Sequence, residues 1–312
     1  MTTSEFFIEW LNDEKLYLQR STYEAYTVYF NRHIIPYFSE RCPELSDITP
    51  RHIKDYVNYI STSGRMDGKQ GGLSRASVRK HLSVLKQALN EACTSEYINV
   101  NPAVSVRLRR SKQLYSDKTV MMTSAEAQKV IDAFKNHVLY PAVVITLYYG
   151  LRRSEILGLR WSSIDFERNE MRIEHTVVKS LTIEAKDSTK TDLSRAVYQL
   201  LPDVREMLLE MKRNAPINTD YIMVWSDGRL FRPDYVTRAF EKQLVKVGLP
   251  KMRFHDLRHS TASILFDLGL SLEEVKNWLR HSDIETTSNI YLHYGKSRKK
   301  IVSNAVSGLF KI

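Results

Sequence analysis

The sequence is poor in cysteine and contains no long apolar run. Its 312 residues include only two cysteines, Cys42 and Cys93, which lie far apart and lack the spacing of metal ligands. This scarcity argues against a disulfide or zinc framework and favours a reducing compartment. No apolar stretch approaches the ~20 residues needed to cross a bilayer, and the N-terminus lacks the pattern of a signal peptide. We therefore expect a cytoplasmic protein without a membrane partner.

Acidic residues are also in the minority. The chain has 46 lysines and arginines against 36 aspartates and glutamates, which gives a formal net charge of +10. Such an excess favours a polyanionic partner, because basic side chains placed on phosphates release condensed counterions. A basic protein with no such partner is the alternative that charge alone leaves open. The length allows about two domains, each with its own core.

The first third of the chain is predicted to be a bundle of four helices with a basic face. Ser21–Glu24 has the form of a capping box, and Pro36 should end the helix that it opens. Thr49-Pro50 supplies the N-cap and first-turn proline of another helix. After a glycine-rich loop at Ser61–Gly72, apolar spacing predicts a helix over Ser77–Ala92. The basic residues expected to contact a polyanionic partner here are Arg75, Arg79, Lys80 and Lys86.

A basic segment follows this bundle. Between Arg107 and Lys118 there are five basic residues, one acidic residue and no apolar period. We predict a linker over residues 107–120, between a first domain at 1–106 and a second at 121–312. The alternative is a solvated loop without contacts. The linker residues expected to touch phosphate are Arg107, Arg109, Arg110 and Lys112.

The second domain is predicted to be mainly α with one small antiparallel β-sheet. Thr123–Glu126 is a capping box, and an apolar helix from Tyr140 should end at Gly150 with a left-handed C-cap. Met171–Val178 and Ala196–Leu200 are rich in β-branched and aromatic residues, which predicts two strands.

The strands are expected to form a hairpin, and helices to follow them. The polar residues from Lys186 to Ser194 fit the tip of the hairpin. Ser271–Glu274 is a further capping box, and Gly269 before it is the expected C-cap of the preceding helix.

Several residues of this domain are suited to phosphate chemistry. Arg152 follows Gly150 in a tight turn, where Glu155 can brace it, and His255 and Arg258 lie one turn apart on a predicted helix. Each of these features has an ordinary explanation as a surface residue. The same is true of a lysine at a hairpin tip, such as Lys190, and of a single tyrosine or histidine near the C-terminus.

In chain order, however, these features resemble the tyrosine recombinase family, the integrases of phages and mobile elements. The matching motifs are Gly150-Leu-Arg152, Lys190-Thr191, His255-Asp-Leu-Arg258, His281-Ser282 and Tyr291-Leu-His293. The first third resembles the core-binding domain of that family, a SAM-like helical bundle. One departure is Arg280, where many members have glycine. Many integrases also carry an N-terminal arm-site domain, which we do not expect in this sequence.

The resemblance implies a mechanism and a role for each residue. Tyr291 is expected to attack a DNA phosphorus and form a 3′-phosphotyrosine, with Lys190 as the general acid. Arg152, Arg258, His255 and His281 are expected to stabilise the charge on the phosphate, with Glu155 in support. His293 is expected to be structural. The resemblance implies that neither a metal ion nor another cofactor is required.

The resemblance also implies partners. These are double-stranded DNA recombination sites, further copies of the chain in a tetramer on DNA, and accessory DNA-bending or directionality factors. The tail from Lys296 to Ile312 carries an apolar stripe that we expect to dock in a neighbouring protomer, although packing on its own domain is the alternative.

Two other functions use similar residues. A type IB topoisomerase also cuts DNA with a tyrosine, but it relaxes supercoils instead of recombining sites. A non-catalytic integrase relative would bind DNA without an aligned nucleophile. We expect a site-specific recombinase that integrates or excises a mobile element.

Overall fold

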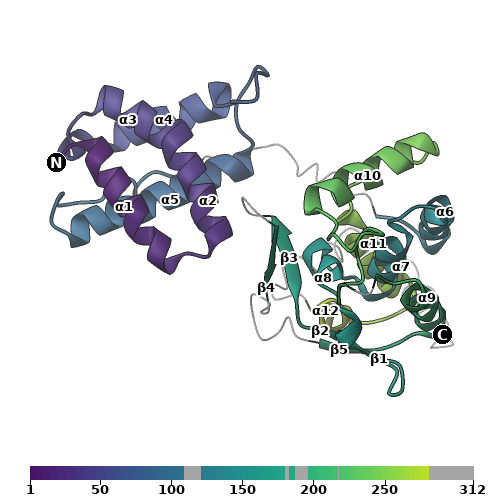
Figure 1. Ribbon diagram of the computed structural model, residues 1–312. Helices are drawn as coiled ribbons and strands as arrows, with labels where there is room; N and C mark the ends of the chain where they lie inside the picture. Colours follow the sequence, from purple (N-terminus) through teal and green to yellow (C-terminus); the bar gives the residue numbers. More distant parts are fainter. Residues whose placement is uncertain (109–120, 180–182, 187–195, 217, 281–312) are drawn as a thin grey trace, which may run out of the picture. The chain divides into compact units, whose positions relative to one another are not determined.

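The computed structural model describes residues 1–108, 121–179, 183–186, 196–216 and 218–280 (Figure 1). The chain forms two compact units, Met1–Ser116 and Asp117–Ile312. No helix within the described ranges is long and apolar enough to cross a membrane.

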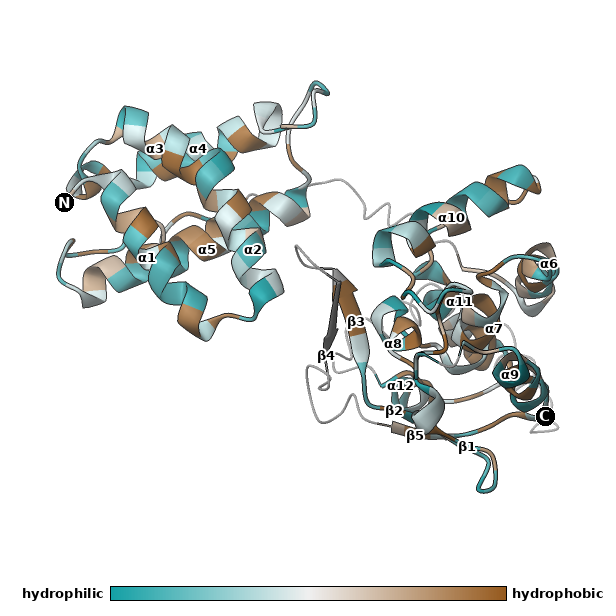
Figure 2. Ribbon diagram, in the orientation of Figure 1, coloured by the Kyte–Doolittle hydropathy of each residue, from teal (hydrophilic) through white to brown (hydrophobic). Residues whose placement is uncertain are grey.

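The elements of the N-terminal unit are all helices or helical turns. Because α2, the π-helical turn η1 and α3 follow one another without a break, its described part consists of four helical rods. The elements are α1 (Thr3–Tyr17), α2 (Arg20–Tyr29), η1 (Phe30–Ile34), α3 (Ile35–Arg41), the 3₁₀ turn η2 (Leu45–Asp47), α4 (Pro50–Ser63) and α5 (Arg75–Thr94). Apolar residues of these helices form a common core. Figure 2 shows apolar and polar residues alternating along each helix.

Two predictions about the start of this unit are wrong. Pro36 does not end a helix, because the π-helical turn η1 precedes it and places it in the first turn of α3, where a missing N–H is tolerated. The helix expected to begin at Ser21 begins at Arg20, and its N-cap Gln19 makes no side-chain cap. Glu24 instead accepts a hydrogen bond from Arg20 Nε at 3.2 Å, so the capping box does not form.

The other expected helix ends of this unit are found. Thr49 caps α4 by accepting a hydrogen bond from the His52 backbone N–H at 3.4 Å, and Pro50 is the first residue of the helix. The helix predicted over Ser77–Ala92 is α5, which begins slightly earlier, after the N-cap Ser74.

The second unit consists of helices, a small sheet and a separate hairpin (Figure 1). Strands β1, β2 and β5 form a three-stranded antiparallel sheet in that order, and β3 pairs with β4. The strands are β1 (Ile164–Asp165), β2 (Glu170–Ile173), β3 (Thr176–Lys179), β4 (Ile183–Lys186) and β5 (Ala196–Gln199). The helices are α6 (Ser124–Phe134), α7 (Tyr140–Tyr149), α8 (Arg153–Leu157), the 3₁₀ turn η3 (Trp161–Ser163), α9 (Pro202–Arg213), α10 (Pro233–Lys246), α11 (Asp256–Asp267) and α12 (Leu272–Leu279).

The strand predicted over Met171–Val178 is two strands in two sheets. The chain leaves the first sheet at His175, whose backbone carbonyl approaches Gly158 so closely that a Cβ there would lie 2.4 Å from it. Arg160 Nη1 also lies 3.3 Å from His175 Nε2. These tertiary contacts interrupt a stretch that local propensity alone would keep as one strand. The hairpin tip was predicted to begin at Lys186, but Lys186 is the last residue of β4 and pairs with Thr176. The rest of the predicted tip, residues 187–194, lies outside the described residues.

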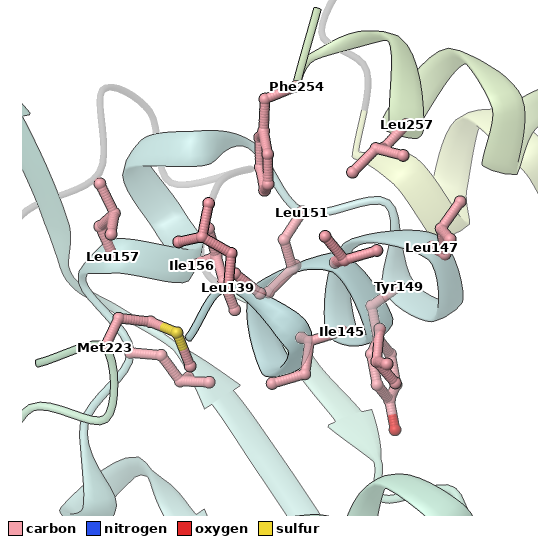
Figure 3. Close-up of a cluster of buried hydrophobic side chains, with 14 of the residues drawn as sticks. Leu139, Ile145, Leu147, Tyr149, Leu151, Ile156, Leu157, Met223, Phe254 and Leu257 are labelled. Carbon is pink, nitrogen blue, oxygen red and sulfur yellow. The ribbon is translucent and has the colours of Figure 1, made fainter. Parts of the chain in front are cut away.

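Helix α7 lies at the centre of the second core. It packs against α6, α8 and α11, and its side chains interleave with those of the following turn (Figure 3). The Thr261 side chain of α11 donates a hydrogen bond to the Leu147 carbonyl at 3.0 Å. This packing holds the C-terminal end of α7 against α11 and α12. The first candidate catalytic arginine, Arg152, follows directly after this end.

Candidate active site

The turn after α7 requires glycine. Gly150 is the C-cap of α7 with a φ of 63°, the left-handed conformation that the sequence predicted. A Cβ at this position would lie 2.0 Å from Leu279 Cδ2 of α12. The turn therefore lies directly against α12, and the chain passes from it into Arg152, the N-cap of α8.

Arg152 is braced by Glu155, as the sequence predicted. Arg152 Nη1 donates to Glu155 Oε1 at 2.7 Å, and the Arg152 backbone N–H donates to Glu155 Oε2 at 2.8 Å. The Glu155 side chain is only 2% exposed, whereas a third of the Arg152 side chain, 33%, reaches solvent. This pair holds a partly open guanidinium in one orientation, because the buried carboxylate grips both its side chain and its backbone.

Arg258 is buried and fixed by backbone carbonyls. It lies in the first turn of α11 and is 1% exposed. Its guanidinium donates to the carbonyl of Gly150 at 2.5 Å and to the carbonyl of Leu279. Arg258 therefore ties together the turn that leads to Arg152 and the end of α12.

Arg280 joins the same cluster. Its Nη2 donates to Glu155 Oε2 at 2.8 Å, and its Nε donates to Tyr198 Oη at 3.0 Å. The sequence marked Arg280 as a departure from the family pattern, but it did not predict that this side chain reaches the brace of Arg152. Tyr198 was not predicted as a site residue, and no motif identifies it.

The charges of this cluster shift two pKa values. Burial alone would raise the pKa of the Glu155 carboxyl, but the guanidinium groups of Arg280 and Arg152 outweigh it and lower the pKa. Burial, together with the nearby Arg152 and Arg280, lowers the pKa of Arg258 to about 9. At neutral pH the cluster therefore holds three guanidinium charges around one carboxylate.

His255 precedes α11 at its N-terminal end. The residue is exposed, but its ring packs against that of His259, with ring centroids 4.9 Å apart, which removes part of it from water. This desolvation, followed by the charges on His259 and Arg258, lowers the pKa of His255 to about 4. The lowered pKa favours a neutral imidazole at physiological pH.

The remaining predicted catalytic residues lie outside the described residues. These are Lys190, His281 and Tyr291, and the same holds for His293 and the tail from Lys296 to Ile312. The described chain ends at Arg280, the residue directly before His281.

The predicted DNA-binding residues of the N-terminal unit differ among themselves. Arg75, Arg79, Lys80 and Arg107 are exposed. Lys86 is half-buried, and its Nζ donates to the carbonyls of Val104 at 3.4 Å and Val106 at 3.0 Å. Arg109, Arg110 and Lys112 lie outside the described residues.

Two family models match the sequence. Residues 120–298, more than half of the chain, match the phage integrase family. The chain belongs to the phage integrase family. Residues 2–61 match the N-terminal SAM-like domain of phage integrases, which confirms the predicted fold class together with the helical N-terminal unit and the small sheet. All six predicted catalytic residues lie within the larger match, and membership of the family makes the chain a tyrosine-class site-specific recombinase.

Individual relatives agree with this membership. A tyrosine recombinase XerC-like protein of Caldanaerobacter subterraneus subsp. tengcongensis is 26% identical over 267 residues, which cover 77% of this chain and 68% of the relative. The ICEBs1 integrase of Bacillus subtilis (strain 168) is 25% identical over 303 residues, covering 92% of this chain and 77% of that protein.

Solved structures show the same fold. The integrase of transposon Tn1549 in complex with transposon right-end DNA matches with a TM-score of 0.78 and 19% identity, over 98% of this chain and all of that one. A lambda integrase tetramer bound to a Holliday junction matches with a TM-score of 0.69 and 19% identity, over 93% of this chain and 77% of that one.

Proposed function

We propose that this protein is a mobile-element integrase that cleaves and rejoins double-stranded DNA through Tyr291. The hydroxyl oxygen of Tyr291 attacks a backbone phosphorus, the bond from phosphorus to the 5′ oxygen breaks, and a 3′-phosphotyrosine forms. Lys190 protonates the leaving 5′ oxygen, and the tyrosine proton passes to a base in the site or to solvent. A 5′-hydroxyl of a partner strand then attacks the phosphotyrosine and releases Tyr291. The energy of the phosphodiester is kept in the covalent intermediate, so no ATP is consumed.

The observation that carries this proposal is the cluster of arginines around Glu155. Arg152 and Arg258 are held by a buried carboxylate and by backbone carbonyls, not by flexible surface contacts. Positive groups fixed in this way stabilise the charge that grows on the non-bridging oxygens, because no reorganisation is needed at the moment of reaction. His255, which is neutral, and His281 complete the proposed set as hydrogen-bond donors.

The proposed binding partner is a recombination site on double-stranded DNA. The Tn1549 integrase is described in complex with transposon DNA, and that protein shares the fold of this chain. We infer that residues 1–106 form a core-binding domain, residues 107–120 the linker, and residues 121–312 the catalytic domain. Contacts from Arg75, Arg79, Lys80 and Arg107 go to phosphate, so they set position more than sequence preference. The proposed location is the cytoplasm.

The tail is proposed to link protomers on DNA. The lambda integrase relative is described as a tetramer on a Holliday junction. Deleting the residues after Lys300 should weaken assembly on paired sites more than binding to a single site. An equal loss of both in a gel-shift titration would contradict this role.

The proposed function is tested with a suicide substrate. Nicked duplexes from the ends of the element are incubated with the protein in EDTA, and covalent protein–DNA adducts are resolved on a denaturing gel. We expect an adduct with the wild type and none with Tyr291→Phe. Tight DNA binding without an adduct would favour a non-catalytic relative, and relaxation of supercoiled plasmid without recombinants would favour a topoisomerase.

A further inference from the structure

Arg280 has a backbone conformation that an arginine rarely adopts. It is the C-cap of α12 with φ 55° and ψ 49°, in the left-handed region where glycine carries no steric cost. Only two other non-glycine residues in the described chain have a positive φ, Glu96 and Asn169. A side chain at such a position needs interactions that offset the strain.

The Arg280 side chain has those interactions. It is 6% exposed and forms an ion pair with Glu155, whose own exposure is 2%. Its Nε donates to Tyr198 Oη, and the hydroxyl of Tyr198 donates in turn to the Trp278 carbonyl at 2.5 Å. The guanidinium thus connects the end of α12 to strand β5 and to helix α8.

These contacts close a ring with the candidate catalytic Arg152. Glu155 Oε1 accepts from Arg152 while Glu155 Oε2 accepts from Arg280, so one buried carboxylate serves both guanidinium groups. In the opposite direction, Arg152 Nη2 donates to the backbone carbonyl of Arg280 at 3.3 Å. A change at residue 280 therefore reaches Arg152 through both the carboxylate and the carbonyl.

We infer that Arg280 is a positioning residue for DNA cleavage: it holds Glu155, and through Glu155 the phosphate clamp Arg152, in the reactive orientation. This inference rests on the proposed function. Glycine at residue 280 would relieve the backbone strain, but it would leave Glu155 with Arg152 as its remaining guanidinium partner. Because small displacements of a positioned group can cost up to about 100-fold in rate, the guanidinium at residue 280 affects the chemical step and not only the helix end.

Two substitutions separate positioning from capping. If Arg280 merely ends α12, Arg280→Gly should cleave at least as well as the wild type, and Arg280→Lys should match it. If Arg280 positions Arg152, Arg280→Gly should be slowest. Arg280→Lys should be intermediate, because an ammonium can pair with Glu155 but cannot form the fork that also reaches Tyr198.

The measurement is single-turnover cleavage of the suicide substrate at saturating DNA, with the Kd determined in parallel. We expect Arg280→Gly to lower the cleavage rate about 10- to 100-fold with little change in Kd. In a Glu155→Gln background the same change should have a smaller effect, because the route through the carboxylate is already removed. Asn169→Gly, which relieves a positive φ in the same unit, is the matched control and should cleave normally.

A second experiment, the dependence of Tm on pH, needs no DNA. The lowered pKa of Glu155 means that its pairing stabilises the folded unit above the unfolded pKa and that this stabilisation is lost as the pH falls through the folded pKa. The Tm of Arg280→Gly should therefore rise relative to the wild type on acidification below the ordinary value of 4.5, and Glu155→Gln should abolish this trend.

The outcomes are distinct. Wild-type cleavage by Arg280→Gly would overturn the inference and leave the proposed function intact. If the wild type forms no adduct, the proposed function fails. The pH experiment then decides alone whether Arg280 and Glu155 are coupled, and a pH-independent Tm difference would overturn the inference.

Discussion

The basic residues of the two units have different surroundings. In the second unit, Arg152, Arg258 and Arg280 are buried or half-buried and are held by a shared carboxylate and by backbone carbonyls. In the N-terminal unit, Arg75, Arg79 and Lys80 stand exposed on the first turns of α5. The first group is oriented before any ligand arrives, whereas the second can follow a flexible partner.

This difference separates two tasks that a phosphate-binding enzyme must perform. Fixed, desolvated guanidinium groups act on charge that develops in the transition state, so their loss should appear in the rate. Exposed lysines and arginines exchange counterions for phosphate, so their loss should appear in affinity and in its salt dependence. Substitutions in the two units test whether rate and affinity separate in this way.

The largest effect is expected for Arg258→Lys. A lysine keeps the charge but cannot span the carbonyls of Gly150 and Leu279, so single-turnover cleavage should fall about 100- to 1000-fold. Arg238→Lys is the control, because Arg238 is exposed on α10 and pairs only locally with Asp234. Equal rates for the two variants at saturating DNA would contradict the clamp role of Arg258.

Gly150→Ala should destabilise the second unit by roughly 2–4 kcal/mol, through left-handed strain and a clash. The added Cβ would meet Leu279 Cδ2 at 2.0 Å. Gly248→Ala is the matched control: its φ is also positive, at 74°, but nothing lies within 4 Å of the added atom. Calorimetry gives the Tm of both variants, and the difference between their losses of Tm isolates the clash with Leu279. An equal loss of Tm in the two variants would mean that α12 does not depend on close packing with this turn.

The N-terminal unit should lose stability in acid through a buried histidine. His81 is 2% exposed and packs beside His33, and burial lowers its pKa from 6.5 to about 4. The unit therefore binds more protons when unfolded, so stability is full above about pH 6.5 and declines toward pH 4, by about 3 kcal/mol. Calorimetry of the full chain should show this loss, and His81→Gln should flatten it. An unchanged pH slope in the variant would contradict the assignment.

The smallest effect is expected for the exposed residues of α5. The double variant Arg79→Ala with Lys80→Ala should weaken DNA binding several-fold and reduce the salt slope by about 0.9 for each phosphate that is no longer neutralised. Its cleavage rate at saturating DNA should not change. Lys86→Met tests a basic residue of α5 that is not free, because its amine donates to the carbonyls of Val104 and Val106. Lower stability with an unchanged salt slope would show that Lys86 anchors this backbone segment and does not bind DNA.

Helix ends and the arginine turn could be predicted from the sequence because their causes are local. Thr123, Ser271 and Gly150 act within a few residues of themselves, and each has the expected cap. The pairing of Arg152 with Glu155 also follows from a three-residue spacing.

The errors have causes that residue patterns do not show, some local and some long-range. Pro36 lies inside a helix because a π-helical turn directly precedes it. The predicted strand is interrupted at His175 because its backbone contacts Gly158, which is distant in the sequence. The role of Arg280 depends on Glu155, 125 residues away, so the sequence showed only an unusual residue at a glycine position.

The most direct test of the account is to locate the tyrosine that becomes linked to DNA. After reaction with a suicide substrate in EDTA, nuclease trimming and tryptic digestion, mass spectrometry should find the nucleotide phosphate on the peptide from His281 to Lys296. That peptide contains both Tyr291 and Tyr294, and fragmentation distinguishes them. We expect the phosphate on Tyr291. A phosphate on Tyr294 or on a tyrosine elsewhere, or bound DNA with no linked peptide, would contradict the proposed mechanism.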